Sequence, residues 1–190
     1  MKNKNLFLRA FFKNPRQVGA LNQTSNFVAK EIINSIDFGK ARCLVELGAG
    51  MGNITRKIVR KMHPECVLFC FEIDSNLAKQ LARNIQDPRV KIISDSAENM
   101  GKYLRQSKIK KADCIISTVP LTTLPYRKMK EILKLSFQYL RSGGKYIQVQ
   151  YSLLGRRYLR MLFPKVAVFF VLLNFPPAFI YVCVKPRTNF

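Results

Sequence analysis

The sequence predicts an α/β fold in which helices cover both faces of a mostly parallel sheet. Five short apolar runs succeed one another along the chain, each followed by a loop and a stretch of helical character. Such alternation of strand and helix is typical of parallel sheets. Two of the loops support this fold class: Gly48, Gly50 and Gly52 follow the first run, and Glu72 follows the second. Folds of this kind bind ligands at the carboxyl ends of their strands.

The expected strands are short runs of mostly apolar residues, and the continuous apolar run 66–71 is typical of a strand buried on both faces. The five strands comprise residues 43–47, 66–71, 90–93, 112–116 and 145–149. The fifth follows a turn at residues 141–144, and helices are expected at 53–62 and 75–85 with Asp74 as the N-cap of the second. Two last strands are expected at 166–173 and 178–184, joined by a turn that contains two prolines.

The glycine loop lets bare backbone approach a ligand, because glycine lacks a Cβ. Asn53 stands where a dinucleotide fingerprint has its third glycine, so the pattern is G-x-G-x-G. With Glu46 two residues ahead, the segment resembles motif I of S-adenosylmethionine-dependent methyltransferases. The resemblance implies a Rossmann-like class I fold with seven strands, the last of them antiparallel. It also implies S-adenosylmethionine as cofactor, bound by Glu46, Gly48, Gly50 and Gly52. The alternative is a tight strand-to-helix turn without a ligand.

Acidic residues follow the second and third expected strands. Glu72 lies 24 residues after Gly48, close to the distance of roughly 20 at which a carboxylate accepts hydrogen bonds from ribose hydroxyls. A solvated charge at a strand end is the alternative. In the resembled methyltransferases, an aspartate after strand three accepts from the adenine amino group and the next backbone N–H meets a ring nitrogen. These roles are implied for Asp95 and Ser96. Either residue also suits a helix N-cap, and the two roles can coexist.

The loop after the fourth strand is the expected place of methyl transfer. Residues 117–121, Ser-Thr-Val-Pro-Leu, stand where amino-methylating enzymes carry a short, proline-containing motif IV. We expect the Ser117 hydroxyl, the Thr118 carbonyl and Tyr151 to contact the acceptor amine, with the tyrosine ring attracting the methylated cation. Sheet-edge packing is the alternative for Tyr151. Because His63 is the single histidine and stands at a helix end, we expect solvent or a polar relay to take the proton of the amine.

Length and composition indicate one globular domain. The chain has 190 residues, of which 48% are hydrophobic, so it is long enough for a sizeable core. Its five cysteines stand mostly inside strand-like runs without zinc-ligand spacing. They are expected to be small buried side chains in a reducing compartment, and no metal site is predicted. The longest apolar stretch, 166–175, is about half of the ~20 residues that a spanning helix needs, and no signal peptide is expected.

The charge is strongly positive and unevenly distributed. Thirty-three basic and eleven acidic residues give a formal net charge of +22. Residues 1–30 carry six basic and no acidic side chains, and residues 132–190 carry nine basic and no acidic ones. This distribution indicates a polyanionic partner, either a membrane surface or a nucleic acid.

Two basic segments favour the membrane. As a helix, residues 6–13 place three phenylalanines and a leucine apart from lysine and arginine, which is typical of a helix lying on an anionic bilayer. Docking of these phenylalanines onto the protein's own core is the alternative. The segment 155–165 combines four cations with apolar residues. Arg156, Arg157 and Arg160 are expected to hold a lipid phosphate, since guanidinium binds phosphate in a bidentate manner.

The chain as a whole resembles bacterial phospholipid N-methyltransferases, which convert phosphatidylethanolamine stepwise to phosphatidylcholine. The resemblance rests on Asn-Pro-Arg-Gln-Val-Gly-Ala at 14–20 followed by Thr24 and Ser25, on the motif IV loop, and on Asn-Phe-Pro-Pro-Ala at 174–178. It implies that Thr24 and Ser25 bind the cofactor. The chain departs from the family pattern at Asn22-Gln23, where a proline is frequent, and at Val119, where leucine is usual.

The implied organisation is a pair of functional segments in one domain. Residues 1–38 are expected to form membrane-binding and cofactor-lid helices, including the N-terminal amphipathic helix. Residues 39–190 are expected to form the methyltransferase domain. The implied partners are an anionic phospholipid membrane and phosphatidylethanolamine, with no obligate protein partner. The expected location is cytoplasmic and peripheral, at the inner face of the cell membrane.

The family is in turn similar to ribosomal RNA adenine dimethyltransferases, which provide the alternative function. Those enzymes carry Asn-Leu-Pro and an aromatic residue in motif IV, whereas this chain has Ser117, Thr118 and Leu121 around its proline. It also offers no segment after the last expected strand for a helical RNA-binding domain. Both differences disfavour a nucleic acid as partner. A basic, membrane-associated adaptor on an inactive methyltransferase fold is a further alternative, disfavoured because Glu72 and Asp95 are present.

Overall fold

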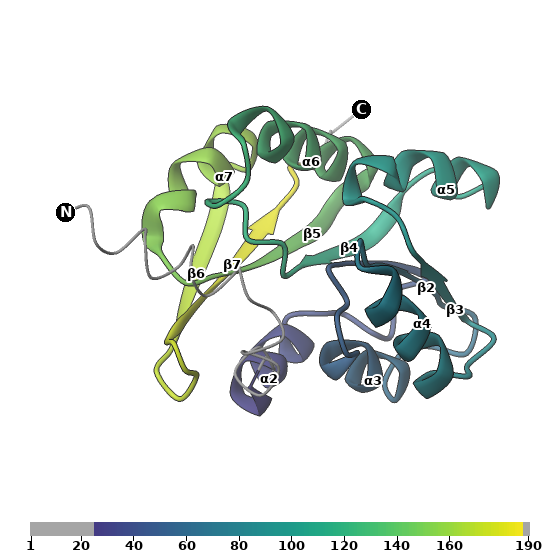
Figure 1. Ribbon diagram of the computed structural model, residues 1–190. Coiled ribbons are helices and arrows are strands. Elements are labelled where there is room, and N and C mark those ends of the chain that lie inside the picture. The colour runs from purple at the N-terminus through teal and green to yellow at the C-terminus, as the bar shows by residue number, and fades with distance from the viewer. Residues whose placement is uncertain (1–24, 188–190) are drawn as a thin grey trace.

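A seven-stranded sheet forms the middle layer of the computed structural model, which describes residues 25–187 (Figure 1). Its order is β3-β2-β1-β4-β5-β7-β6. The strands are β1 (Cys43–Leu47), β2 (Val67–Phe71), β3 (Val90–Ile93), β4 (Ala112–Ser117), β5 (Leu140–Gln150), β6 (Lys165–Val171) and β7 (Ala178–Val184). Strands β1 to β5 pair in parallel, and β7 runs antiparallel to both of its neighbours, β5 and β6. The predicted mostly parallel sheet with an antiparallel last strand is confirmed.

Helices cover both faces of this sheet, as the ribbon shows (Figure 1). One layer contains α2 (Asn26–Asn34), α3 (Asn53–Val59) and α4 (Ser75–Asn84). The other contains η1 (Ala97–Asn99), α5 (Met100–Gln106), α6 (Tyr126–Tyr139), η2 (Leu153–Gly155) and α7 (Arg156–Leu162). The alternation of side chains along each strand divides the core between the two layers. In β1, for example, Leu44 packs with the α2–α4 layer, whereas Val45 and Leu47 pack with the α5–α7 layer.

The strand bounds differ most from the sequence prediction at β5 and β6, whereas β2 and β4 differ by one residue at one end. Residues 141–144, predicted as a turn, belong to β5, where the register shifts between Ala112 and Cys114 of β4. Gly143 there has φ 73° and donates its N–H to Lys185 O, so the pairing with the C-terminal strand continues through the glycines. Strand β6 ends at Val171 rather than at residue 173, because Leu172 and Leu173 turn outward into solvent.

The segment after β6 is tied to the start of α2. Asn174 accepts a hydrogen bond from Ser25 N–H at 3.1 Å and donates to Pro176 O at 2.6 Å. Ile32 and Ile33 of α2 belong to the core between the α2–α4 layer and the sheet.

The predicted amphipathic helix at 6–13 lies outside the described residues, and the predicted division at residue 38 stays a prediction. Within residues 25–187, no helix is long and apolar enough to cross a bilayer.

All five cysteines are free and buried, as the sequence predicts. Burial raises the pKa of the Cys43, Cys114 and Cys183 thiols to about 12 and that of Cys66 to about 11. The pKa of Cys70 is raised as well, by burial and then by the neighbouring Glu46 carboxyl. These thiols are therefore protonated and inaccessible at neutral pH.

Candidate active site

The central cavity lies at the carboxyl ends of β1, β2, β3 and β4, where the sequence predicts ligand binding. Its volume is about 360 Å³, within the range of roughly 300–1,000 Å³ typical of small-molecule sites. It brings together seven of the predicted site residues, which come from separate loops. They are Gly48, Gly50, Glu72, Asp95, Ser96, Thr118 and Tyr151.

The three glycines of the loop after β1 have different surroundings, although all have positive φ, at 81°, 53° and 82°. A Cβ at Gly48 would lie 2.9 Å from Thr118 Oγ1, and one at Gly52 would lie 2.4 Å from Leu81 Cδ1. Gly48 and Gly52 therefore let the loop pack closely against its neighbours. A Cβ at Gly50 would meet no atom within 4 Å, so this position opens onto the cavity. Gly52 itself does not border the cavity.

Glu72, the residue after β2, forms part of the cavity wall and is only 8% exposed, which argues against a freely solvated charge. Its carboxylate accepts hydrogen bonds from Gly50 N–H at 2.8 Å and from Asp74 N–H at 3.0 Å. Since each carboxylate oxygen has a second lone pair, both can still accept from a ligand. Asp74 caps α4 as predicted, accepting from Asn76 N–H and Leu77 N–H.

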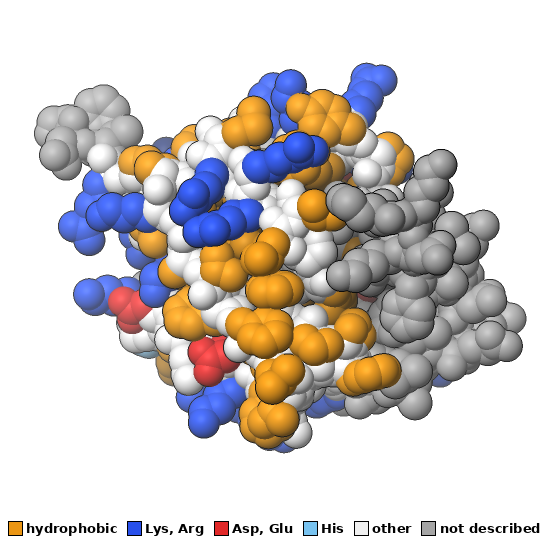
Figure 2. Space-filling model, turned by 90° about the vertical axis from the view of Figure 1, so that its left-hand side faces the viewer, with side chains coloured by type: hydrophobic (Ala, Val, Ile, Leu, Met, Phe, Trp, Pro, Cys, Tyr) orange, Lys and Arg blue, Asp and Glu red, His pale blue; other side chains and the backbone are white. Residues whose placement is uncertain are grey.

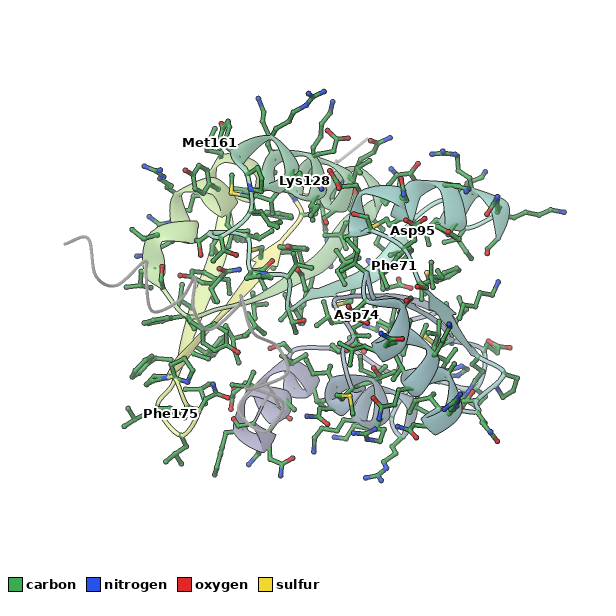
Figure 3. All side chains as sticks on the ribbon, in the orientation of Figure 1. Phe71, Asp74, Asp95, Lys128, Met161 and Phe175 are labelled. Carbon is green, nitrogen blue, oxygen red and sulfur yellow. The ribbon has the colours of Figure 1, made fainter. Side chains whose placement is uncertain are left out.

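Asp95 and Ser96 follow β3 and both border the central cavity, and the predicted contact of these residues to adenine stays a prediction. Ser96 Oγ caps η1 by accepting from Glu98 N–H. Asp95 accepts from Asn99 Nδ2 and from the Tyr103 hydroxyl, both at 2.8 Å, and these bonds hold the pKa of its carboxyl below the usual value. Figure 3 shows Asp95 and Phe71 at the ends of β3 and β2, where both border the cavity.

The motif IV loop after β4 is fixed by residues of β5 that the sequence analysis missed. Gln148 and Gln150 are buried, and their side-chain amides donate to Val119 O at 2.9 Å and 3.2 Å. On the other side, the Thr118 hydroxyl donates to Gly48 O at 2.6 Å. The loop is thus joined both to the glycine loop and to β5. Glutamines at alternate positions of the otherwise apolar segment 146–150, at the end of β5, were the available signal for this role.

Ser117 and Tyr151 differ in their access to the cavity. Ser117 is the last residue of β4 and is fully buried, so its hydroxyl does not border the cavity as the predicted contact to an amine requires. Tyr151 follows β5, borders the cavity and also packs against the core, so the predicted packing is present and the contact to the amine stays a prediction. Burial raises the pKa of its hydroxyl, so this group stays protonated at neutral pH.

Glu46 lies beneath the glycine loop rather than in the cavity, in contrast to the predicted cofactor contact. Its side chain is fully buried and accepts from the Thr55 hydroxyl at 2.7 Å through Oε2, while Oε1 has no partner among the described residues. Burial raises the pKa of this carboxyl to about 7, and the Thr55 hydrogen bond opposes that rise.

Two other residues that were predicted to bind the cofactor lie away from the central cavity or outside the described residues. Ser25 caps α2 and does not border the cavity, and Thr24 lies outside the described residues.

A second, larger hollow adjoins the motif IV loop, with a volume of about 820 Å³. We call it the arginine cavity, since Arg156, Arg157 and Arg160 line it and no acidic residue does among those described. Arg157 lies over the Tyr158 ring at 4.6 Å from its centroid. Leu124 borders both cavities, so the arginine cavity and the central cavity are neighbours.

The apolar walls and a cation of the central cavity were not predicted. Phe71, Leu77 and Ala97 provide apolar surface beside Glu72 and Asp95. Lys128 of α6, labelled in Figure 3, also borders the cavity and pairs with Glu98 at 3.7 Å. Nothing in the local sequence around Lys128 distinguished it from the other lysines of its amphipathic helix.

Comparison with known proteins decides the family. Residues 12–156 match the model of the family described as ribosomal RNA adenine dimethylase. The chain belongs to the ribosomal RNA adenine dimethylase family. Among curated proteins, it is 28% identical over 192 residues to an ornithine lipid N-methyltransferase from Singulisphaera acidiphila, with all of both chains covered.

Solved structures similar to this member of the family share its fold. An rRNA methylase from Streptococcus thermophilus has a TM-score of 0.65 at 15% identity, covering 87% of this chain and 99% of that one. Magnesium protoporphyrin IX methyltransferase from Synechocystis, solved with bound S-adenosylmethionine, has a TM-score of 0.66 at 12% identity, covering 97% and 98%. The fold is that of a Rossmann-like class I methyltransferase, and the protein is an S-adenosylmethionine-dependent methyltransferase.

The residues of the central cavity fit this cofactor. Gly50 leaves open backbone at the place where a Cβ would otherwise project. Glu72 provides acceptors for a ribose diol, and Asp95 provides an acceptor for an amino group. Phe71, Leu77 and Ala97 provide apolar surface for a purine. The cofactor supplies an electrophilic methyl carbon on a sulfonium, and the chain must provide the place for the acceptor.

Proposed function

We propose that this enzyme methylates the headgroup amine of a membrane lipid. The single observation that carries the proposal is the arginine cavity beside the motif IV loop, in which three arginines accompany apolar side chains. A lipid whose headgroup combines an oxyanion with an amine matches these two features, because guanidinium groups bind oxyanions and the neighbouring central cavity binds the methyl donor. The relative named for ornithine lipid N-methylation supports a lipid amine as acceptor.

Two lipids offer this chemistry. Phosphatidylethanolamine, which the sequence resemblance implies, has a phosphate and a primary amine. Ornithine acylated on one of its amines keeps a carboxylate and a second amine. In either case the oxyanion is held by Arg156, Arg157 and Arg160, and the amine reaches the motif IV loop past Leu124, which borders both cavities. The proposal therefore commits to an oxyanion-bearing amine lipid and leaves the choice between the two sources to the assay.

The reaction needs few groups from the protein. The amine lone pair forms the new N–C bond while the C–S bond breaks and its electron pair returns to sulfur, and the product ammonium then loses a proton to solvent. Burial raises the pKa of the Tyr151 hydroxyl, so this group carries its own proton at neutral pH. We expect the Tyr151 ring, which borders the central cavity, to attract the methylated cation. The hydrogen bonds of Gln148 and Gln150 to Val119 O support a rigid loop that positions the amine.

A direct assay tests the proposal. The protein is incubated with S-adenosylmethionine labelled in its methyl group and with vesicles that contain phosphatidylethanolamine, ornithine lipid or neither, and separately with total RNA. We expect label in one or both amine lipids and none in RNA. The match to the ribosomal RNA adenine dimethylase family supports methylation of rRNA adenine as the second candidate function. Label in RNA but not in lipid would establish that candidate and refute ours.

Matched charge variants sharpen the assay. Replacing Arg156, Arg157 and Arg160 by alanine removes three cations from the arginine cavity and is expected to lower kcat/KM for lipid by tenfold or more, since each charge-assisted bond contributes about 1.5–3 kcal/mol. The control removes three exposed cations from the α3–α4 side. These are Arg60, Lys61 and Arg83. Equal losses in both variants would attribute the effect to net charge rather than to the cavity.

A further inference from the structure

Exposed hydrophobic side chains gather along one edge of the molecule. We call this group the apolar ridge and define it by Met161, Phe169, Phe170, Leu172, Leu173 and Phe175. It extends from α7 along β6 to the β6–β7 turn, and Figure 3 labels its two ends at Met161 and Phe175. Figure 2 views this side of the molecule and shows hydrophobic side chains gathered from the middle of the face to its bottom, with further ones above them.

The large apolar side chains of the ridge are strongly exposed to solvent. Leu172, Leu173 and Phe175 are 68%, 65% and 72% exposed at the tip of the turn. Phe169 and Phe170 are consecutive residues of β6, so they point to opposite faces of the strand, and both are exposed. Large exposed apolar patches on soluble proteins mark interaction sites. Strand β6 also lies at an edge of the sheet, and an apolar edge strand promotes association with another surface unless something covers it.

The basic side chains around the ridge indicate which kind of partner it binds. The whole C-terminal part of the chain, residues 132–190, contains nine basic residues and no acidic one. Arg156, Arg157 and Arg160 of α7 and Lys165 at the start of β6 adjoin the ridge. In Figure 2, Lys and Arg gather above the main group of hydrophobic side chains, and the acidic side chains visible on this face lie at or beyond its left border. An apolar strip bordered by cations complements an anionic bilayer, whose interior is apolar and whose surface is negative.

We infer that the apolar ridge enters the surface of an anionic lipid bilayer, with the turn at 172–175 inserted and the α7 arginines at the headgroups. The inference rests on the proposed function in one respect: it supplies the route by which a lipid reaches the arginine cavity. Leu153 and Leu154 line that cavity and are themselves exposed, so its rim is apolar. A lipid enters the cavity from the bilayer without crossing water. A second copy of the chain suits the ridge less, because a symmetric contact would bring two basic borders together.

Tryptophan fluorescence provides the test, because the chain contains no tryptophan. Leu173→Trp places a single fluorophore at the tip of the turn, and Gln80→Trp places one on the exposed side of α4 as control. On addition of vesicles with phosphatidylethanolamine and phosphatidylglycerol, the emission of Leu173→Trp is expected to shift to shorter wavelength. Brominated lipids are expected to quench it severalfold more than the emission of the control. Equal quenching of the two variants would overturn the inference.

Two other results would also overturn it by identifying a different occupant of the ridge. Emission of Leu173→Trp that is already shifted without vesicles, together with a dimer in analytical ultracentrifugation, would assign the ridge to a second copy. The same shifted emission in a monomer, abolished by deleting residues 1–24, would assign it to the protein's own N-terminal segment. A shift that needs vesicles, in a monomer, supports the bilayer.

A second variant connects insertion with turnover. Leu172→Gln combined with Leu173→Gln is expected to lower the vesicle partition coefficient at least tenfold, because burial of one leucine changes it by about that factor or more. Methyl transfer to the same lipid dissolved in detergent micelles should stay unchanged, whereas transfer in vesicles should fall with partitioning. Micellar methylation without insertion of the turn would refute the inference and leave the proposed function intact. Insertion of the turn without methylation of either lipid would support the inference and refute the proposed function.

Discussion

Replacing Glu46 by glutamine should remove a pH dependence of folding stability that this one buried carboxyl creates. The pKa of Glu46 is raised by burial from an ordinary value of 4.5 to about 7. Between these values the folded chain keeps a proton that the unfolded chain releases. The stability contributed by this proton is therefore fully present below pH 4.5 and is lost as the pH rises to 7.

The magnitude follows from the difference between the two pKa values. It corresponds to about 3 kcal/mol in the free energy of unfolding, of which about 2 kcal/mol is lost between pH 5.5 and pH 8. The glutamine side chain cannot ionise, so Glu46→Gln should lack this loss and gain about 2 kcal/mol relative to the wild type over the same interval. All other titratable groups are common to both proteins and cancel in the comparison.

Urea unfolding at a series of pH values measures the effect. A second variant, Thr55→Val, removes the hydroxyl that donates to the Glu46 carboxylate at 2.7 Å. Because this bond opposes the rise in pKa, its loss should move the decline in stability of Thr55→Val to higher pH. If the wild type and Glu46→Gln lose stability in parallel between pH 5.5 and pH 8, burial does not hold the proton on Glu46 and the reasoning is refuted.

Three further predictions concern the central cavity and the membrane. Glu72→Ala should weaken S-adenosylmethionine binding at least tenfold in calorimetry, since charge-assisted bonds contribute about 1.5–3 kcal/mol each; undiminished affinity would contradict the assignment of Glu72 to the cofactor. Gly50→Val should abolish S-adenosylmethionine binding, because a side chain at φ 53° costs on the order of 1–3 kcal/mol and fills the open space. The control variant Gly39→Ala, at a position where φ is not positive, should bind the cofactor normally. Deletion of residues 1–13 should reduce flotation of the protein with anionic vesicles, and so should raised salt. Each cation near the membrane surface contributes about 1 kcal/mol within a screening length of about 10 Å. Equal flotation with neutral and anionic vesicles would argue against electrostatic binding.

The sheet was predictable because its strands are short apolar runs bounded by loops. The bounds of β1, β3 and β7 agree with those expected from the sequence. The start of β5 was not predictable from local sequence, because Gly143 and Gly144 are typical of a turn and only pairing with the C-terminal strand keeps them in the sheet. The end of β6 failed for the opposite reason: Leu172 and Leu173 continue an apolar pattern whose exposure depends on the turn.

For the site, the decisive variable was the position of a residue relative to its strand end. Gly48, Glu72, Thr118 and Tyr151 each follow directly after the last residue of a strand, and each borders the central cavity. Most residues inside a strand instead point into one of its two buried faces, although Phe71 at the end of β2 also borders the cavity. Glu46, one residue before the end of β1, and Ser117, the last residue of β4, are therefore buried, although their chemistry suited the predicted roles.

The buried cysteines make the protein a convenient host for site-specific labels. All five native thiols are inaccessible, and the pKa is raised for each of them, so maleimide or methanethiosulfonate reagents should leave the folded chain unmodified. A cysteine introduced at a single exposed position would then be the sole reactive one, without any need for a cysteine-free background. Paired nitroxides placed on α4 and at the β6–β7 turn would report the tilt of the sheet relative to a supported bilayer by electron paramagnetic resonance.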